Sequence, residues 1–309
     1  MEIPLDPTNN RKSPDLSGLL SKVWLNGEQL AAPQALSVFD RAAQFGDGLF
    51  ETILINKAQC PLIDAHLQRL TEGLNTLNIA LDQEALINDF MQALEHAMQF
   101  PEQLFRLKIR VSRGESQTAY RYEPGLLVNR IVEISPLPVN HSHLQQGVIT
   151  RLCDWQLSHQ PALVTVKHLN RLDQVMARSE WHKLDNPEHY FEGLMCDQRG
   201  FITEGTMSNL FWRCQKGILH TPILDEAGVA GVMRQKILEL CQQENIHYEL
   251  SRLTLEELPD IQSLFMCNSL LGVIPVQAIE TKQGFIPLNS ANNTQIKTIM
   301  NGVNTLLSL

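Results

Sequence analysis

A single lysine stands in the segment of this sequence best suited to covalent chemistry. Residues 164–171 read Val-Thr-Val-Lys-His-Leu-Asn-Arg, and the three β-branched residues before Lys167 predict the end of a strand. Residues 172–178 predict a helix, so rigid elements would hold the amine on both sides. Burial disfavours the ammonium, lowers the pKa of a lysine and leaves an amine that can form an imine with a carbonyl. Taken alone, however, Lys167 is better explained as an ordinary solvated lysine.

A second feature could bind an anion. Gly231 directly precedes a predicted helix that begins near Val232. The first backbone N–H groups of a helix have no partner within it, and the helix dipole is positive at that end. A helix that starts after glycine is common, so this feature gains meaning only together with other residues.

Strands and helices alternate in the first half. Asn26 and Gly27 form a hairpin signal, Asp64 can cap a helix, and residues 105–111 alternate as a half-buried strand should. Leu67, Leu70, Leu74 and Leu77 share one helix face and predict core packing. The expected elements are a strand–turn–strand at 23–30, a glycine-punctuated loop at 40–48, strands at 49–55, 105–111 and 130–135, and helices at 64–77 and 85–98.

The second half has a similar mixture. The expected elements are strands at 147–153, 193–196, 201–203, 210–214, 218–220 and 263–267, hairpin turns at 197–200 and 215–217, and helices at 172–178, 232–243 and 294–307. Such a mixture in both halves predicts an α+β or α/β fold.

The length of 309 residues predicts two domains, because one hydrophobic core rarely grows that large. We expect an N-terminal extension at 1–22, a small α/β domain at 23–138, a linker at 139–146 and a larger domain at 147–309.

Composition narrows the function. A net charge of −9 argues against nucleic acid as the main partner, because phosphate backbones select basic surfaces. The sequence has no phosphate-binding Gly-x-x-x-x-Gly-Lys-[Ser/Thr] loop and no Gly-x-Ser-x-Gly elbow. His141 and His143 lie in a polar stretch without further ligands, so we expect no metal site.

The six cysteines form no paired spacing, and several lie in apolar runs such as 195–196 and 266–267. This usage indicates a reducing compartment. No stretch is long and apolar enough to span a membrane, and residues 1–13 lack a hydrophobic signal segment. We therefore expect a cytoplasmic protein with no membrane partner.

Several motifs occur in the order found in one enzyme family. In chain order they lie at 44–52, 66–70, 167–172, 200–211, 230–235 and 265–270. Together, over about residues 23 to 280, the sequence resembles the fold-type IV pyridoxal-phosphate enzymes, which include branched-chain aminotransferases, D-amino-acid aminotransferases and aminodeoxychorismate lyases. The Lys-His-Leu-Asn-Arg-Leu segment and the Phe-Gly-Asp-Gly loop are most similar to the lyases. The resemblance implies the two-domain fold of D-amino-acid aminotransferases.

The resemblance also implies roles for residues around pyridoxal 5′-phosphate. Lys167 would be the catalytic lysine that forms an imine with the cofactor, and Glu204 would face the pyridine nitrogen. Asn209 would brace backbone and leave the cofactor untouched. The cofactor's phosphate would lie in a cup formed by Arg69, Gly231, Val232, Met233, Asn268 and Ser269.

The substrate side is less defined by the motifs. A dicarboxylate substrate needs cationic contacts, and the candidates are Arg41, His168, Arg171 and Arg121. Many relatives have an arginine at the position of Thr118, and Arg121 lies three residues later. Each candidate could also have a purely structural role, and a histidine in the position of His168 is more often structural than catalytic.

The function implied is a lyase that converts the small molecule 4-amino-4-deoxychorismate into 4-aminobenzoate, a folate precursor, and pyruvate. Such enzymes are expected to be homodimers. The alternative is a branched-chain or D-amino-acid aminotransferase, which the altered loop at 115–122 slightly favours. A third possibility is a catalytically idle relative used as a binding module, against which the intact Lys167 and Glu204 argue.

Overall fold

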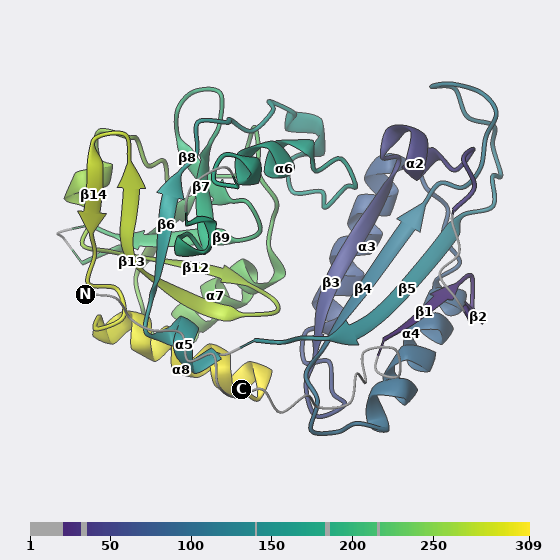
Figure 1. The fold of residues 1–309 in the computed structure, drawn as a ribbon, viewed down its shortest axis with the longest axis horizontal. Coiled ribbons are helices and arrows are strands. Elements are labelled where there is room, and N and C mark those ends of the chain that lie inside the picture. The colour runs from purple at the N-terminus through teal and green to yellow at the C-terminus, as the bar shows by residue number, and fades with distance from the viewer. Residues whose placement is uncertain (1–20, 32–35, 140, 183–185, 215–216) are drawn as a thin grey trace.

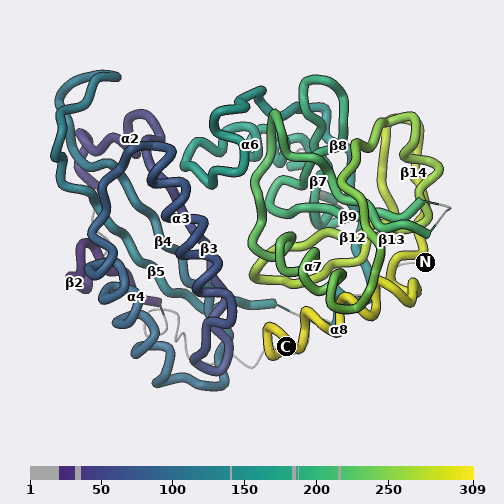
Figure 2. Tube along the Cα trace, turned by 180° about the vertical axis from the view of Figure 1, so that it is seen from behind, coloured from purple at the N-terminus to yellow at the C-terminus, as the bar shows by residue number. Residues whose placement is uncertain are grey.

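The chain folds around two β-sheets that stand side by side (Figures 1 and 2). Our computed structural model describes residues 21–31, 36–139, 141–182, 186–214 and 217–309. The N-terminal elements, purple to blue, lie on one side, and the green and yellow C-terminal elements lie on the other. The fold is therefore a mixture of α and β elements in both parts, as the sequence predicted.

The first sheet has five strands in the order β2-β1-β5-β4-β3, all antiparallel. Its strands are β1 (Lys22–Leu25), β2 (Glu28–Gln29), β3 (Gly48–Ile55), β4 (Phe105–Ser112) and β5 (Asn129–Pro136). Helices α3 (Ile63–Leu77) and α4 (Gln83–Met98) cover one face of it, and the short α2 (Arg41–Phe45) precedes β3. The predicted turn between β1 and β2 is confirmed, with positive φ at Asn26 and Gly27.

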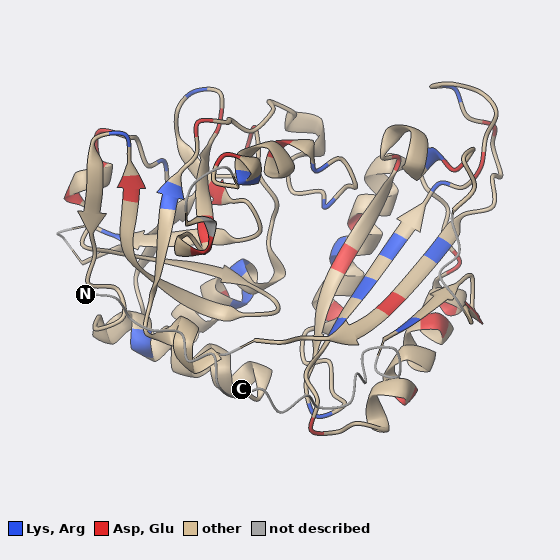
Figure 3. Cartoon of the chain, in the orientation of Figure 1, with Lys and Arg blue, Asp and Glu red and all other residues tan. Residues whose placement is uncertain are grey.

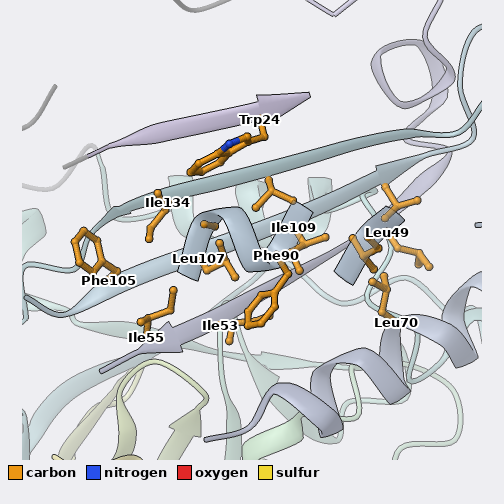
Figure 4. Packing of buried hydrophobic residues seen from close by; sticks show 14 of the residues in the cluster. Trp24, Leu49, Ile53, Ile55, Leu70, Phe90, Phe105, Leu107, Ile109 and Ile134 are labelled. Atoms are coloured by element: carbon orange, nitrogen blue, oxygen red, sulfur yellow. The ribbon is translucent and has the colours of Figure 1, made fainter. Parts of the chain in front are cut away.

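A hydrophobic core lies between this sheet and α3 and α4 (Figure 4). Phe105, Leu107 and Ile109 on β4 are completely buried there. Burying a side chain of this size stabilises the fold by about 1.5–3 kcal/mol. The residues between them, Arg106 and Lys108, project from the other face of the strand, which no helix covers. The predicted alternation along β4 is therefore confirmed.

The second sheet has nine strands, with eight in the order β11-β10-β9-β12-β13-β6-β7-β8 and β14 paired with β13. The strands are β6 (Val148–Leu152), β7 (Glu192–Cys196), β8 (Ile202–Gly205), β9 (Asn209–Arg213), β10 (Leu219–Pro222), β11 (Tyr248–Ser251), β12 (Ser263–Asn268), β13 (Gly272–Thr281) and β14 (Gly284–Pro287). Helix α7 (Val232–Gln243) packs on β12 and α8 (Thr294–Leu307) packs on β13. Both helices have the bounds that the sequence predicted.

Three local predictions were wrong. Residues 164–166 form no strand, because Thr165 has φ +75 and the chain turns there after a short 3-10 helix, Pro161–Leu163. The predicted loop at 40–48 contains α2, which Asp40 caps. Helix α3 begins at Ile63, so Asp64 lies in its first turn and does not cap it.

The stretch predicted as a linker, 139–146, contains the short helix α5 (His141–Gln145). The predicted extension up to residue 20 lies outside the described residues, and so do two residues of the predicted turn at 215–217. Helix α6 (Leu172–Ser179), which follows the lysine, is confirmed.

Other features expected from the composition can be checked in the described part of the chain. No described helix has the length and apolar character needed to cross a bilayer. No described group of His, Cys, Asp and Glu side chains could hold a metal ion. All six cysteines are free thiols, and Cys153, Cys196, Cys241 and Cys267 are buried.

Candidate active site

A cavity of about 380 Å³ opens between the two sheets. It is lined from the first sheet by residues of β3, β4 and α3, and from the second by the ends of β8 and β12 and the start of α7. All eight residues that the sequence predicted around the cofactor line this one cavity: Arg69, Lys167, Glu204, Gly231, Val232, Met233, Asn268 and Ser269. The fold therefore brings together residues that lie up to 200 positions apart in the sequence.

Lys167 is held by the edge of β3, in place of the strand that the sequence predicted. The Phe50 N–H donates to the Lys167 carbonyl at 3.0 Å, and the Leu169 N–H donates to the Gly48 carbonyl at 2.9 Å. Burial, together with the nearby Arg69 charge, lowers the pKa of Lys167 to about 8. The side chain thus has the property of a nucleophilic amine.

Glu204 lies on β8 with only 4% of its surface exposed. The Val229 N–H donates to one carboxylate oxygen at 2.8 Å, and the Gln174 amide donates to the other at 3.3 Å. Burial raises the pKa of Glu204 above its ordinary value, although these contacts and the Arg171 charge oppose the shift. The carboxylate therefore lies in the cavity wall, where its oxygens can accept a further hydrogen bond from a bound ligand.

The N-terminus of α7 points into the cavity and has no side-chain cap. Gly231 is the N-cap residue, and a Cβ added there would lie 1.8 Å from the Asn209 Oδ1 atom. Asn209 in turn donates from its amide to the Val229 carbonyl at 2.8 Å, so it braces the backbone as predicted. Only glycine fits this close approach, and the free N–H groups of α7 remain open to an anion.

Arg69 lies on α3 beside this helix start. Its guanidinium makes two hydrogen bonds to Glu51, at 2.8 and 2.5 Å, and a third to the Ala230 carbonyl at 2.9 Å. Burial alone would raise the pKa of Glu51, but the Arg69 charge and hydrogen bonds from His66 and Arg69 lower it to about 2. A cationic fork is thus fixed next to the free N–H groups of α7.

Asn268 and Ser269 end β12 at the cavity, as predicted. The Ser269 hydroxyl donates to the Thr52 carbonyl at 3.0 Å, and the Asn268 side-chain oxygen accepts from the Leu270 and Leu271 N–H groups. The cradle of uncapped helix, glycine and guanidinium has N–H donors for a phosphate monoester, whereas the Ser269 hydroxyl proton is used by Thr52. Together with an amine of lowered pKa and a buried carboxylate, it fits pyridoxal phosphate.

Two of the four predicted substrate residues lie near the site. Arg171 lines the first cavity and also a second one of about 390 Å³, and it donates to the carbonyls of His168 and Val166. His168 lines only the second cavity. Burial, aided by the Arg171 charge, lowers the pKa of His168 to about 4, so its imidazole is neutral near pH 7.

The other two candidates line neither cavity in the described part of the chain. Arg41 is buried, pairs with Asp47 at 2.8 Å and donates to the carbonyls of Ala119, Tyr120 and Arg121. Its guanidinium therefore clamps the loop that follows β4. The Arg121 side chain is exposed on that loop.

Sequence reasoning missed four charged groups at the site, which are Glu51, Arg106, Lys108 and Glu133. Arg106 and Lys108 line the cavity from β4, along which Figure 3 shows a row of basic residues. The alternation of residues 105–111 could have identified them, because it places both on the face opposite the core. Glu51 had no comparable signal, since an inward-facing carboxylate in an apolar strand is recognisable only once its partners are known.

Comparisons with known proteins agree with this site. The sequence model of the class IV amino-transferase family matches residues 48–279 of this chain. Aminodeoxychorismate lyase from Vibrio harveyi is 35% identical over 269 residues, which are 85% of this chain and 93% of the relative. D-alanine aminotransferase from Bacillus licheniformis is 27% identical over 264 residues, or 84% of this chain and 88% of the relative.

Solved structures show the same fold. The crystal structure of 4-amino-4-deoxychorismate lyase from Pseudomonas aeruginosa matches with a TM-score of 0.79 and 33% identity, covering 92% of this chain and 98% of that one. Branched-chain aminotransferase from Escherichia coli has the same TM-score at 20% identity, covering 93% and 94%, and shows the fold alone. This chain belongs to the class IV aminotransferase family and is a pyridoxal-phosphate-dependent enzyme of fold-type IV.

Proposed function

We propose that this enzyme is an aminodeoxychorismate lyase, which converts 4-amino-4-deoxychorismate into 4-aminobenzoate and pyruvate. The observation that carries the proposal is that Lys167, with its pKa lowered to about 8, lines the same cavity as Glu204 and the uncapped start of α7. Support for the substrate comes from two relatives named as this lyase, which are 35% and 33% identical to the chain.

The residues proposed to hold the cofactor form three groups. The Lys167 amine is the group to which the cofactor bonds, and Glu204 keeps a proton on the pyridine nitrogen. The phosphate lies against the start of α7 in a cup that consists of Arg69, Gly231, Val232, Met233, Asn268 and Ser269. When bound, pyridoxal phosphate supplies an aldehyde that bonds to amines and a charged ring that withdraws electrons from the carbon beside them.

Lys167 is proposed to have a second role as a base. Once the substrate's amine has replaced it, the free Lys167 amine can take the proton from the carbon that bears that nitrogen. Its lowered pKa favours this step, since an ordinary lysine would stay protonated near neutral pH. Breaking the bond between the ring carbon and the enolpyruvyl oxygen then makes the carbocycle aromatic, and the enolpyruvate that leaves takes up a proton to become pyruvate. Aromatisation favours this step, so the enzyme's main task is positioning.

The two carboxylates of the substrate need cations in the wall. Arg171 is the one predicted candidate that lines the cavity, and Arg106 and Lys108 add two more. Among the described residues, Arg106 and its neighbour Arg110 both pair with Glu133, at 3.9 and 3.0 Å, whereas Lys108 has no such ion pair. We propose Lys108 and Arg171 as the carboxylate contacts. Arg41, Arg121 and the neutral His168 are secondary candidates.

Product analysis tests the lyase. The protein is incubated with aminodeoxychorismate, and pyruvate and 4-aminobenzoate are measured in equal amounts. In parallel, it is incubated with branched-chain or D-amino acids and 2-oxoglutarate. The proposal is overturned if keto acids form from the amino acids while aminodeoxychorismate is left intact.

An aminotransferase is the second candidate. The 27% identity to a D-alanine aminotransferase and the loop at 115–122, which has Thr118 in place of an arginine, favour it. The same incubation with amino acids decides between the two, because only an aminotransferase moves the amino group onto 2-oxoglutarate. A catalytically idle binding module would give neither product, and the purified protein would stay colourless when pyridoxal phosphate is added.

Three further properties are proposed from the sequence and family. The enzyme is a homodimer in the cytoplasm, and its chain divides into domains at 23–138 and 147–309 after the extension at 1–22. Six free thiols support a reducing compartment. Light scattering tests the dimer, cell fractionation tests the location, and limited proteolysis within 139–146 tests the boundary.

A further inference from the structure

A buried carboxylate lies behind the proposed phosphate cup. Glu51 points from β3 into the core, where it is 1% exposed. Its oxygens accept two hydrogen bonds from Arg69, at 2.8 and 2.5 Å, and the His66 Nδ1 atom lies 2.7 Å from one of them. An ionised carboxylate in such a place is stable only because these partners compensate the lost water.

The geometry of α3 makes this cluster possible. His66 and Arg69 lie three residues apart and so project from the same side of the helix. Burial lowers the pKa of His66, although Glu51 opposes the shift. The imidazole is therefore neutral, and its Nδ1–H donates to Glu51. Arg69 is thus the cation that is hydrogen-bonded to Glu51, and the two form one unit. The Glu51 charge also acts on Lys167, whose pKa it raises.

The same guanidinium reaches the other sheet. The third hydrogen bond of Arg69 goes to the Ala230 carbonyl at 2.9 Å, one residue before Gly231 and the start of α7. The Nε and Nη2 atoms of the guanidinium donate to Glu51, and the Nη1 atom donates to the Ala230 carbonyl. The N–H bonds that are left are therefore fixed in direction beside the free amides of α7.

We propose that Glu51 is a positioning residue for phosphate binding, which sets the affinity for the cofactor by fixing the direction of the Arg69 guanidinium. The inference rests on the proposed role of Arg69 in the cup. Glu51 has two opposite effects on the affinity for a phosphate. Its negative charge repels a phosphate, so charge alone predicts that removing it tightens binding. Positioning predicts weaker binding, because Arg69 must then be ordered when the phosphate arrives.

The test compares pyridoxal phosphate with pyridoxal, which lacks the phosphate. Both are titrated into the full-length protein after removal of bound cofactor, and absorbance reports binding. For Glu51→Gln we expect the Kd of pyridoxal phosphate to rise about tenfold, the scale of a lost charged hydrogen bond. The Kd of pyridoxal should stay unchanged or fall, because Glu51 raises the pKa of Lys167 and its loss favours the neutral amine that bonds to both ligands. Glu51→Asp keeps the charge but shortens the reach, so positioning predicts a similar loss.

Two further variants make the result decisive. Asp89→Asn breaks an equally buried carboxylate–arginine pair with Arg130, at 2.7 Å, away from the cavity. It should lower the melting temperature without changing either Kd. In an Arg69→Gln background, Glu51→Gln should change the Kd of pyridoxal phosphate by no more than about twofold, because the residue acts through Arg69.

The outcomes separate this inference from the proposed cup. If Arg69→Gln leaves the Kd of pyridoxal phosphate unchanged, the proposed cup is wrong. If Arg69→Gln weakens binding but Glu51→Gln tightens it, leaves it unchanged or weakens both ligands equally, the positioning role is wrong. Should Glu51→Gln fail to fold, Glu51→Asp decides between the two effects, since wild-type affinity in that variant would leave only a charge effect.

Discussion

The Nζ atom of Lys167 lies 4.5 Å from the centroid of the Phe50 ring, while the Phe50 N–H donates to the Lys167 carbonyl at 3.0 Å. One residue of β3 therefore holds the lysine at both its backbone and its amine. The amine lines the cavity, and burial together with the nearby Arg69 charge accounts for its lowered pKa.

Replacing Lys167 with alanine should abolish turnover, with a fall of at least about a thousandfold, because Lys167 supplies the amine to which the cofactor bonds and Lys108, on the β4 wall of the cavity, is expected to leave that role unfilled. Borohydride reduction and peptide mapping of the holoenzyme should label Lys167 in the wild type and no lysine in the variant. Lys282→Met, at an exposed residue paired with Asp154, is the control. Covalent labelling and turnover in Lys167→Ala would contradict the assignment.

Attachment of pyridoxal to the cofactor-free protein should follow the titration of Lys167. The neutral amine is the reactive form, so the rate should rise about fivefold from pH 7 to 8 and level off above a pKa of about 8. A lysine with the ordinary pKa of 10.5 would give a rate that still rises at pH 9. Arg69→Gln removes a cation that lowers the pKa, so its profile should move to higher pH. A profile without a plateau would contradict the burial of the amine.

Much of the fold and the candidate site was predicted correctly where residue type and backbone conformation depend on neighbouring residues in the sequence. The Asn26-Gly27 turn, the alternation of β4 and the bounds of α7 each depend on residues a few positions apart. The strand predicted before Lys167 failed because Thr165 takes a left-handed φ, which its β-branched type opposes. Contacts of residues 48–50 and of Gly228 impose that turn, and such distant contacts leave no local pattern.

The roles of the charged residues were also hard to predict, because their partners lie far away in the sequence. Arg69 was predicted to lie in the phosphate cup, but its partner Glu51, 18 positions earlier on another element, was not predicted. Arg41 looked like a substrate contact, yet the carbonyls that it binds are almost 80 positions later. A side chain's role in these cases depends on where its partner lies in space, and one sequence does not give that distance.

Gly231→Ala should weaken cofactor binding by at least about tenfold, because its Cβ would meet Asn209 at 1.8 Å and displace the start of α7. Removing the obstructing side chain in Gly231→Ala/Asn209→Ala should restore part of the affinity, measured by titration with pyridoxal phosphate. Gly302→Ala in α8 is the matched control, since its Cβ would meet only Leu240 at 2.6 Å. The control should affect the melting temperature and leave the affinity unchanged. Equal affinity losses at both glycines would contradict the prediction.

Glu204→Gln should keep the contact with the Val229 N–H but lose the charge, so turnover should fall about a hundredfold or more. The Kd of pyridoxal phosphate should change much less. Burial raises the pKa of Glu204, so the wild-type activity should fall on the acid side at a pH above the ordinary value of 4.5. That fall should be absent in the variant, whose amide does not titrate. A wild-type rate and pH profile in Glu204→Gln would remove the residue from the mechanism.

Lys108→Met tests the proposed carboxylate contact. Lys108 lines the cavity from β4, and its pKa is lowered by burial and by the neighbouring Arg110. Losing one charged contact to the substrate should raise the KM for aminodeoxychorismate about tenfold, with kcat within about threefold. The Kd of pyridoxal phosphate should not change, since Lys108 is not part of the phosphate cup. The KM of the variant should also depend less on salt, because one attraction between charges is gone. A fall in kcat at constant KM would instead assign Lys108 to the chemical step.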